Sequence, residues 1–437
     1  MEKPIFLIAA PTSNSGKTLV TLGLIKALTD QGLTVQPFKC GPDYIDPMHH
    51  SEIAGRASYN LDLWMSSEQH VRSIVQEQMA DADVGIFEGV MGLFDGARRD
   101  EGSSAAIARL LNVKVILIVD ASSVAYSVAP LLFGFQHFDT RISLGGVIFN
   151  KVAGPSHYQF LKEAADDAGV QALGYVPRHK ALAIEDRHLG LHLPGESREA
   201  EIVLRAASLI RKHVDVDSLV NNCNCKIPSE KETFSDETPL LTIAIACDQA
   251  FNFSYRANID CLEKLGKVRY FSPLNDEAVP DADVVWLSGG YPELYGPQLS
   301  QNRKMQESIK KLVENDKIVI AECGGMMYLG QSIISQDGDV HNMVGLFNYS
   351  TSFKQMKLHL GYRQVFIGKE ILKGHEFHYS ELVNNSCSKG NYEVQNARGK
   401  KVDMAVFRYK KVWASYMHLY LGEMDKMKRF LSHLSQG

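Results

Sequence analysis

The sequence lacks a long apolar run, a strong excess of one charge and any cluster of basic residues. Its 437 residues carry 46 Lys and Arg against 51 Asp and Glu, a formal net charge of -5. Without a basic patch, nucleic acid is not expected as a partner. The apolar stretch before Pro11 spans only about six residues, too short for a membrane span or a signal segment. We therefore expect a cytoplasmic protein without a membrane or nucleic-acid partner.

Cysteine is also scarce, and its pattern is irregular. The 7 cysteines are an odd number scattered along the chain. This spacing does not suggest a disulfide framework, and a cytosolic chain would keep the thiols reduced. Cys223 and Cys225 form a Cys-x-Cys pair, but no second pair lies at zinc-ligand spacing, so we interpret them as ordinary linker cysteines.

The chain predicts two α/β domains joined by a polar linker. Short β-branched runs alternate with helical stretches over residues 1–218, which indicates a parallel sheet covered by helices on both faces. The stretch 219–239 is polar and aperiodic, as expected for a linker. The alternation of strands and helices resumes in 240–437, so the second domain is also expected to be α/β.

A phosphate-binding loop is predicted directly after the first strand. The segment APTSNSGKT ends in Ser15, Gly16, Lys17 and Thr18 and opens a helix. Backbone N–H groups at a helix N-terminus cradle phosphates, the lysine reaches the β- and γ-phosphates, and the threonine hydroxyl can ligate Mg²⁺. Pro11 stands where the usual pattern has its first glycine, so an ordinary strand-to-helix turn is the alternative. The strand before the loop and the helix after it favour ATP binding.

Four acidic residues follow the next strands of the first domain. Asp43 and Asp46 lie in a loop bracketed by prolines, Glu88 ends a strand, and Asp95 follows in the next loop. Ligands of an open parallel sheet bind at this edge. Asp beside Pro or Gly is commonly only a turn or cap residue. As a group, however, these acids favour a Mg²⁺ ion held among carboxylates and phosphate oxygens.

In the second domain, AECGG at residues 321–325 has the features of a nucleophile turn. A strand leads into Cys323, and the following glycines permit a sharp turn into a helix. The positive end of the helix starting at Gly324 is expected to lower the thiol pKa. The alternative for an isolated cysteine at a strand end is a small buried apolar residue.

A base and an oxyanion site are predicted elsewhere in the same domain. His418 lies in ASYMHLY, on the last predicted strand, and Ser288, Gly289 and Gly290 end another strand. Backbone N–H groups of Gly290 and Gly324 are the expected oxyanion donors. A cysteine and a histidine that are distant in sequence but close in space are typical of thiol catalysis.

These segments resemble the cobyrinate a,c-diamide synthase family of glutamine-dependent amidating enzymes. The resemblance rests on KCGPDYIDPMHH, EGVMGLFDG and EDRHLGLHLP in the first domain and on the AECGG, SGG and SYMH segments in the second. It implies an ATP domain similar to dethiobiotin synthetase and a class I glutamine amidotransferase domain. One departure from common class I members is Tyr420, which stands where an acid follows the histidine. The cobyrinate-type branch of class I resembles this chain in lacking that acid. Glu423 is an alternative residue for orienting His418.

The resemblance also implies roles for individual residues. Thr18, Asp43 and Glu88 would hold the metal, and Asp46 and Asp95 would serve the acceptor carboxylate and its acyl phosphate. Contacts with adenine would come from Asn150 and from YVPR, which contains Pro177.

The segment KGHEFHYSE, at residues 373–381, is typical of the family but has no assigned role. HEFH lacks the histidine spacing of the zinc motif HExxH, so a metal site is disfavoured. Two interpretations of the segment stay open. In the first it shapes a domain interface or binds part of the macrocycle, and in the second it is a structural loop. The residues concerned are His375, Glu376, His378 and Tyr379.

The expected reaction is ATP-dependent amidation of the a and c carboxylates of cobyrinate through acyl phosphates, with nitrogen from L-glutamine. The same chemistry on hydrogenobyrinate or nickel-sirohydrochlorin stays open. A partitioning or regulatory ATPase with a decayed glutaminase domain is a third alternative, against which the intact Cys323, His418 and SGG segment argue. The sequence leaves open whether the protein forms a homodimer.

Overall fold

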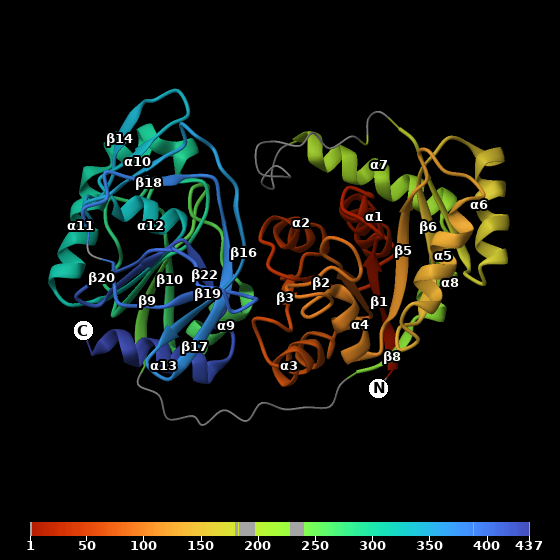
Figure 1. The fold of residues 1–437 in the computed structure, drawn as a ribbon, viewed down its shortest axis with the longest axis horizontal. Helices are drawn as coiled ribbons and strands as arrows, with labels where there is room; N and C mark the ends of the chain where they lie inside the picture. Colours follow the sequence, from red (N-terminus) through yellow and green to blue (C-terminus); the bar gives the residue numbers. More distant parts are fainter. Residues whose placement is uncertain (1, 180–181, 183–196, 228–239, 388, 437) are drawn as a thin grey trace. The chain divides into compact units, whose positions relative to one another are not determined.

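The computed structural model describes residues 2–179, 182, 197–227, 240–387 and 389–436. The chain divides into two compact units, Met1–Thr233 and Phe234–Gly437, each built on its own parallel sheet (Figure 1). All seven cysteines are free thiols, as expected for a reduced protein. No helix in the described part of the chain has the length and apolar character that a membrane crossing requires.

The first unit contains an eight-stranded sheet with the order β3-β2-β4-β1-β5-β6-β7, and β8 pairs with β1. The seven strands of this path run parallel, and β8 is antiparallel. The strands are β1 (Glu2–Ala9), β2 (Val35–Cys40), β3 (Tyr59–Leu61), β4 (Val84–Glu88), β5 (Lys114–Asp120), β6 (Leu144–Val152), β7 (Ala172–Pro177) and β8 (Asn224–Lys226).

Helices cover both faces of this sheet, which explains why its strands are apolar along their whole length. On one face, the core includes α1 and α7, which lie side by side in Figure 1. On the other face, α5 and α6 pack against β5 and β6. The helices are α1 (Lys17–Thr29), α2 (Ile45–Ala54), α3 (Glu68–Gln78), α4 (Ser104–Leu111), α5 (Val128–His137), α6 (Pro155–Asp167), α7 (Ser197–His213) and α8 (Val216–Asn222).

The structure differs from the prediction at the start of the linker 219–239, where it has regular secondary structure. Residues up to Asn222 belong to α8, and Asn224–Lys226 form β8 against β1. Leu219 and Cys223 are buried in the core of the first unit, so this polar-looking segment is tied down by a few apolar side chains. Residues 228–239 of the predicted linker and 185–194, the segment EDRHLGLHLP, lie outside the described residues.

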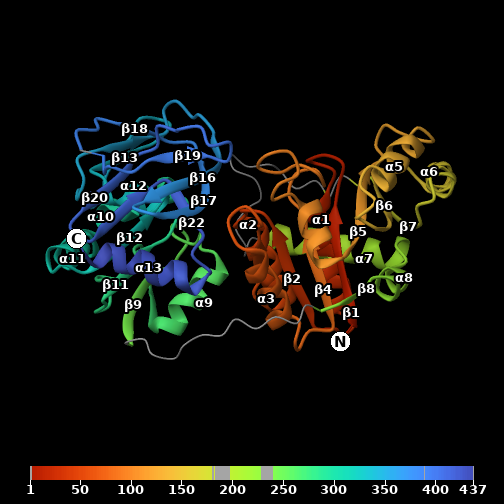
Figure 2. The same cartoon turned by 60° about the horizontal axis from the view of Figure 1, so that its bottom comes forward.

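The second unit has a six-stranded sheet with the order β10-β9-β11-β12-β21-β20, parallel except for the edge strand β20. Figure 2 labels its strands β9, β11, β12 and β20. Its strands are β9 (Leu241–Ala246), β10 (Gly266–Phe271), β11 (Val284–Leu287), β12 (Ile318–Glu322), β20 (Val406–Tyr409) and β21 (Val412–Ser415). The helical segments are α9 (Arg256–Leu265), the 3₁₀ helix η2 (Pro292–Tyr295), α10 (Gly296–Gln301), α11 (Arg303–Glu314), α12 (Gly324–Leu329) and α13 (Met424–Ser435).

Two four-stranded sheets complete this unit, and the sequence did not predict them. Their strands are short or partly exposed, which weakens the apolar alternation on which sequence prediction depends. The first contains β14 (Val340–Asn342), β13 (Ser332–Ile334), β15 (Ser350–Ser352) and β18 (Glu381–Val383). The second contains β19 (Val394–Asn396), β16 (His359–Ile367), β17 (Glu370–His378) and β22 (Met417–Leu419).

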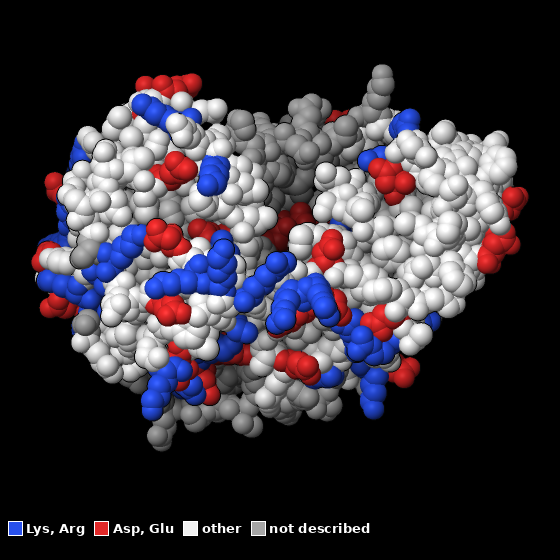
Figure 3. All heavy atoms as spheres, in the orientation of Figure 1, with Lys and Arg blue, Asp and Glu red and all other residues white. Residues whose placement is uncertain are grey.

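The surface charges agree with the near-neutral composition. On the face drawn in Figure 3, acidic side chains lie among the basic ones on both units. This face therefore carries both signs of charge on each unit.

Candidate active site

The predicted phosphate loop lies between β1 and α1, as the sequence indicated. Gly16 has φ 91° and forms the N-cap of α1, and Lys17 is the first helical residue. A Cβ atom at Gly16 would lie 2.1 Å from Asn150 Nδ2, so both its backbone conformation and its surroundings require glycine. Lys17 is buried and donates to the carbonyl oxygen of Met91 at 2.6 Å.

A buried cluster of charged groups lies beside this loop. Thr18 Oγ1 donates to Glu88 Oε1 at 2.6 Å and lies 3.4 Å from Asp46 Oδ2. The ammonium of Lys39 forms ion pairs with both Asp46 and Glu88. Asp43 lies farther out, 3.7 Å from the same ammonium. The structure thus brings together four of the five predicted metal and acceptor residues.

Two members of this cluster, Lys39 and His50, were missed by the sequence analysis. His50 Nε2 lies 2.7 Å from Glu88 Oε2. The i, i+4 spacing of Asp46 and His50 was an available signal, but it applies only if both lie on a helix. The prediction that Asp46 lies in a loop was wrong, because α2 begins at Ile45. Asp43 Oδ1 accepts the backbone N–H groups of Ile45 and Asp46 and so starts the helix early.

The cluster holds three carboxyl groups around the Lys39 ammonium, and its buried members shift one another's pKa values. Burial, together with Asp43 and Glu88, raises the pKa of Asp46 well above its ordinary value. Burial opposes ionisation of Glu88, but Lys39 and His50 hold its pKa below the usual range. Burial lowers the pKa of Lys17, and the nearby Lys39 ammonium lowers it further. A hydroxyl and several carboxyl groups that lie close together are donors that suit Mg²⁺.

The remaining predicted residues of the first unit lie outside the cluster. Asn150 Nδ2 donates to Ser15 O at 2.9 Å and its Oδ1 accepts the N–H of Lys151, so this side chain braces the loop. Pro177 ends β7, beside Val152 on β6. Asp95 Oδ2 accepts the N–H of Gly92 at 2.9 Å, which is the turn role weighed from the sequence.

Cys323 lies at a strained turn between β12 and α12. Its φ of 45° and ψ of -102° are unusual for a residue other than glycine. Backbone bonds hold this conformation: Cys323 N donates to Ser415 O at 2.8 Å, and Met327 N donates to Cys323 O at 2.9 Å. Gly325 leaves no room for a side chain, because a Cβ atom there would lie 2.2 Å from Leu287 O. The predicted nucleophile turn is present in this geometry.

The predicted oxyanion and base residues meet at the same sheet edge. A Cβ atom on Gly324 would lie 3.0 Å from the backbone N of Gly290, so these two backbone segments are adjacent. Gly289 faces the imidazole of His418, since a Cβ atom at Gly289 would lie 2.2 Å from His418 Cε1. The parallel pairing of β11 with β12 places the SGG segment beside Cys323.

The expectation of a lowered thiol pKa was wrong. Burial raises the pKa of Cys323 above its ordinary value, and the carboxylate of Glu293 raises it further. The N–H of Gly324 acts in the opposite direction but is outweighed. Burial lowers the pKa of His418 to about 3, with His375 contributing. At neutral pH the resting pair is therefore a thiol and a neutral imidazole rather than a thiolate and an imidazolium.

Glu322 fixes the strand that carries His418, a contact the sequence analysis did not anticipate. Its Oε1 accepts the backbone N–H of Leu419 at 2.8 Å, and burial raises its pKa to about 8. Tyr420 is buried against Tyr255. Glu423, the weak candidate from the sequence, forms an ion pair with Lys426.

Most of the KGHEFHYSE segment lies in strand β17, which ends at His378, and Glu381 begins β18. His375 on β17 pairs in register with His418 on β22. Glu376 accepts from Arg363 Nε at 2.6 Å and lies 2.9 Å from His378 Nε2. Tyr379 follows the strand, and its carbonyl accepts the N–H of Lys357.

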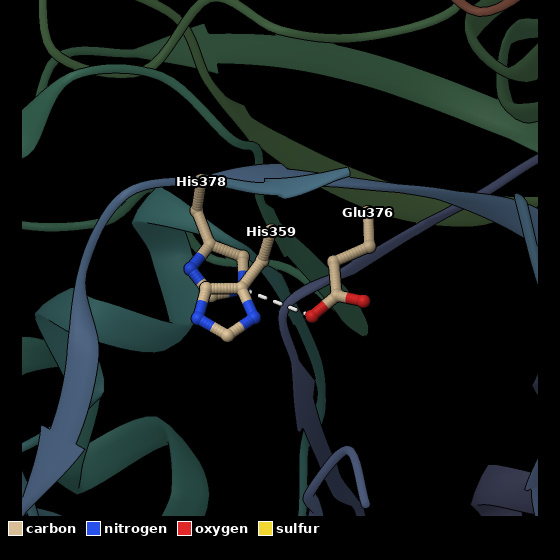
Figure 4. Close-up of side chains that lie close together, drawn as sticks. All are labelled: His359, Glu376 and His378. Carbon is tan, nitrogen blue, oxygen red and sulfur yellow. Dashed lines mark hydrogen bonds and ion pairs between the residues drawn. The ribbon is translucent and has the colours of Figure 1, made fainter. Parts of the chain in front are cut away.

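His359, on the neighbouring strand β16, joins Glu376 and His378 in a compact group (Figure 4). The rings of His359 and His378 stack with centroids 4.8 Å apart, and ligand atoms of all three residues lie within 4.8 Å of one another. Residue type and spacing would allow a metal ion. Because Glu376 already has Arg363 and His378 as partners, we interpret the group as a hydrogen-bonded network built on the Arg363–Glu376 ion pair.

Comparison with known proteins identifies the family. Residues 6–191 match the CobQ/CobB/MinD/ParA nucleotide binding domain, and residues 242–426 match the CobB/CobQ-like glutamine amidotransferase domain. The hydrogenobyrinate a,c-diamide synthase of Brucella anthropi is 39% identical over 431 residues, which cover 95% of this chain and 98% of that protein. The chain belongs to the a,c-diamide synthase family.

Two further family members show the same near-complete coverage. The cobyrinate a,c-diamide synthase of Salmonella typhimurium is 37% identical over 97% of this chain and 96% of its own length. The enzyme of that name from Caldanaerobacter subterraneus subsp. tengcongensis is 37% identical over 99% of this chain and 98% of its own length. The a,c-diamide synthase family thus accounts for both units of the chain, as the sequence resemblance predicted.

Proposed function

We propose that the protein is a glutamine-hydrolysing carbon–nitrogen ligase that amidates the a and c carboxylates of cobyrinate in cobalamin biosynthesis. The observation that carries this proposal is the similarity to a,c-diamide synthases over 95% to 99% of the chain. The phosphate loop of the first unit and the Cys323 turn of the second supply the two half-reactions. Because ATP and glutamine are cytoplasmic reactants, we place the reaction in the cytoplasm.

Hydrogenobyrinate, the metal-free counterpart, is the second candidate acceptor. The relatives from Brucella carry that name and are as similar to this chain as those named for cobyrinate. Amidation assays with cobyrinate, hydrogenobyrinate and nickel-sirohydrochlorin, followed by mass spectrometry, test the choice. We expect diamide product from cobyrinate; diamide from nickel-sirohydrochlorin alone would contradict the proposal.

In the ATP half, the acceptor carboxylate must lose its negative charge before a nucleophile can attack it. Transfer of the γ-phosphoryl group makes an acyl phosphate, which ammonia then displaces to give the amide and phosphate. Lys17 stabilises the charge that develops on the transferred group, and backbone N–H groups at the start of α1 hold the phosphates. Asn150 keeps the loop in place through Ser15.

Thr18, Glu88 and Asp43 would hold Mg²⁺ in this half, with Asp46 beside them. When bound, Mg²⁺ supplies charge neutralisation for the phosphate oxygens. Lys39 occupies the centre of the same carboxylates and balances part of their charge. Asp46 and Asp95 remain the proposed residues for the acceptor side.

In the glutaminase half, Cys323 attacks the side-chain amide carbon of glutamine. The thiol proton passes to His418 as the carbon–sulfur bond forms, and His418 gives it to the departing ammonia. The N–H groups of Gly290 and Gly324 stabilise the oxyanion. Water then hydrolyses the thioester to glutamate. Because the resting pair is neutral, thiol deprotonation is coupled to substrate attack rather than completed beforehand.

Thr18→Ala is expected to weaken binding of Mg-ATP roughly 10- to 100-fold, because it removes a hydroxyl ligand beside Glu88. Thr18→Ser keeps the hydroxyl and should retain near-normal affinity. The measurement is the rise in thermal unfolding temperature on adding ATP with and without Mg²⁺. Equal Mg-dependent stabilisation in the alanine and serine variants would contradict a role for this hydroxyl.

Gly289→Ala is expected to lower glutaminase activity by roughly 100-fold, because the added methyl group collides with the His418 ring and displaces it. Gly134→Ala is the matched control, since a Cβ atom there meets nothing within 4 Å. Ammonia-dependent amidation should be unchanged in both variants. Normal glutaminase activity in Gly289→Ala would show that the position of His418 does not limit the reaction.

A further inference from the structure

Glu293 presents a buried carboxylate oxygen with no protein partner. It lies in η2, directly after the SGG segment, and its Oε2 atom is buried and accepts no hydrogen bond from any described residue. Burial raises its pKa to about 8. A buried polar group without a partner destabilises the folded protein. A carboxylate left in this state is suited to a cationic partner from outside the chain.

The electrostatic contacts of Glu293 place it beside the nucleophile. Among charged groups, Glu293 has the largest effect on the pKa of Cys323, and it also contributes to the raised pKa of Tyr416. Its neighbour Pro292 packs against Gly324, because a Cβ atom on that glycine would lie 2.9 Å from Pro292 Cδ. Glu293 therefore belongs to the rim of the Cys323 turn.

The other carboxylates that affect Cys323 already have partners. Glu376 bonds to Arg363 and His378, and Glu322 accepts the N–H of Leu419. Of these three carboxylates, Glu293 is the one with a buried oxygen that has no hydrogen-bond partner among the described residues. This oxygen is therefore available to a ligand.

Glutamine supplies the complementary group. Its α-carbon is three carbon–carbon bonds from the amide carbon that Cys323 attacks, and it bears an ammonium group. An ammonium–carboxylate hydrogen bond is charge-assisted and about twice as strong as a neutral one. We propose that Glu293 binds the α-ammonium group of glutamine and thereby selects α-amino acid amides over simple amides. This inference rests on the proposed glutaminase function.

The proposal predicts a pH dependence of glutamine binding. In the free protein Glu293 is mostly protonated at pH 7, because its pKa is about 8. An ammonium ligand favours the carboxylate form, so binding at pH 7 releases a proton. KM for glutamine should therefore fall as pH rises from 7 towards 8. Cys323 and Tyr416 sense Glu293, and their own pKa values are raised above this range. Glu322, which also acts on Cys323, has a pKa of about 8 as well, so the pH change is assigned to Glu293 by its loss in Glu293→Gln.

The test compares glutamine with glutaramate, which has the same amide and carboxylate but no amino group. Wild-type protein should favour glutamine by roughly 100-fold or more in kcat/KM, because glutaramate leaves Glu293 unpaired. In Glu293→Gln this preference should fall to within a few-fold of unity, through a raised KM for glutamine. Glu307→Gln, on an exposed position of α11, is the matched control and should keep the preference.

Two further readouts separate the possible outcomes. Alkylation of Cys323 by iodoacetamide and ammonia-dependent amidation report on the turn and on the other half-site, and both should persist in Glu293→Gln. Equal losses for glutamine and glutaramate would overturn the proposal, as would a wild-type KM for glutamine that does not change between pH 7 and 8. The pH test needs no variant. If wild-type protein hydrolyses neither amide while ammonia-dependent amidation is intact, the proposed glutaminase function is wrong. The proposed role of Glu293, which rests on that function, is then wrong as well.

Discussion

Cys323→Ser is expected to abolish glutamine-dependent amidation while ammonia-dependent amidation continues. Serine keeps the size and polarity of the side chain, so the strained turn should persist, but its hydroxyl is a far weaker nucleophile than the thiol. Loss of a covalent nucleophile costs roughly 10³-fold or more in turnover. The measurement is amide formation with glutamine or with an ammonium salt as the nitrogen source, together with release of glutamate.

The matched control is Cys247→Ser, because Cys247 is an exposed free thiol in the same unit. It should keep both activities. If Cys323→Ser lost both nitrogen sources together, the two half-sites would not be separable. If it lost neither, Cys323 would not be the nucleophile.

Lys17→Met is expected to produce the reverse pattern. Removing the ammonium should lower amidation with either nitrogen source by roughly 10²–10⁴-fold, because the γ-phosphoryl transfer loses its charge stabilisation. Glutamate release from glutamine should remain, since Cys323 belongs to the other unit. Methionine preserves most of the buried length of the side chain. ATP consumption and glutamate release are measured in the same reaction.

Lys26→Met is the control for this change, because Lys26 lies on the same helix and pairs with Asp30 near its end. A surface ion pair of this kind contributes about 0.2–1 kcal/mol, so activity should stay near normal. Unimpaired ammonia-dependent amidation in Lys17→Met would exclude the proposed phosphate contact.

Local patterns explain why the centre of each site could be predicted from the sequence. The phosphate loop and the Cys323 turn each occupy a few consecutive residues between a strand and a helix, and parallel strands bring such turns to one edge of a sheet. For this reason Lys17, Glu88, Cys323 and His418 could be named before the fold was known. The fold class followed from the same alternation of strands and helices.

The groups that modify these centres could not be predicted, because they depend on contacts between distant segments. Lys39 meets Glu88 only because β2 pairs with β4. His359 meets His378 only through the register of β16 and β17. The thiol pKa was misjudged for a related reason: the sequence shows the helix that follows Cys323 but not the burial that outweighs it.

The structure partly explains how His418 is held in position without an acid two residues after it. Glu322, one residue before the nucleophile, holds the backbone of Leu419, and Gly289 limits where the imidazole can lie. Strand pairing and close packing thus constrain the position of His418. This is consistent with Tyr420 serving as a buried packing residue.

The most direct test of the central claim is transfer of nitrogen from glutamine to the acceptor. Wild-type protein would be incubated with ATP, Mg²⁺, cobyrinate and glutamine labelled with ¹⁵N in the side-chain amide, and the product analysed by mass spectrometry. The account predicts an a,c-diamide carrying the label in both new amides, with one ATP hydrolysed for each amide formed. Recovery of unchanged cobyrinate, with glutamine and ATP consumed independently of each other, would contradict it.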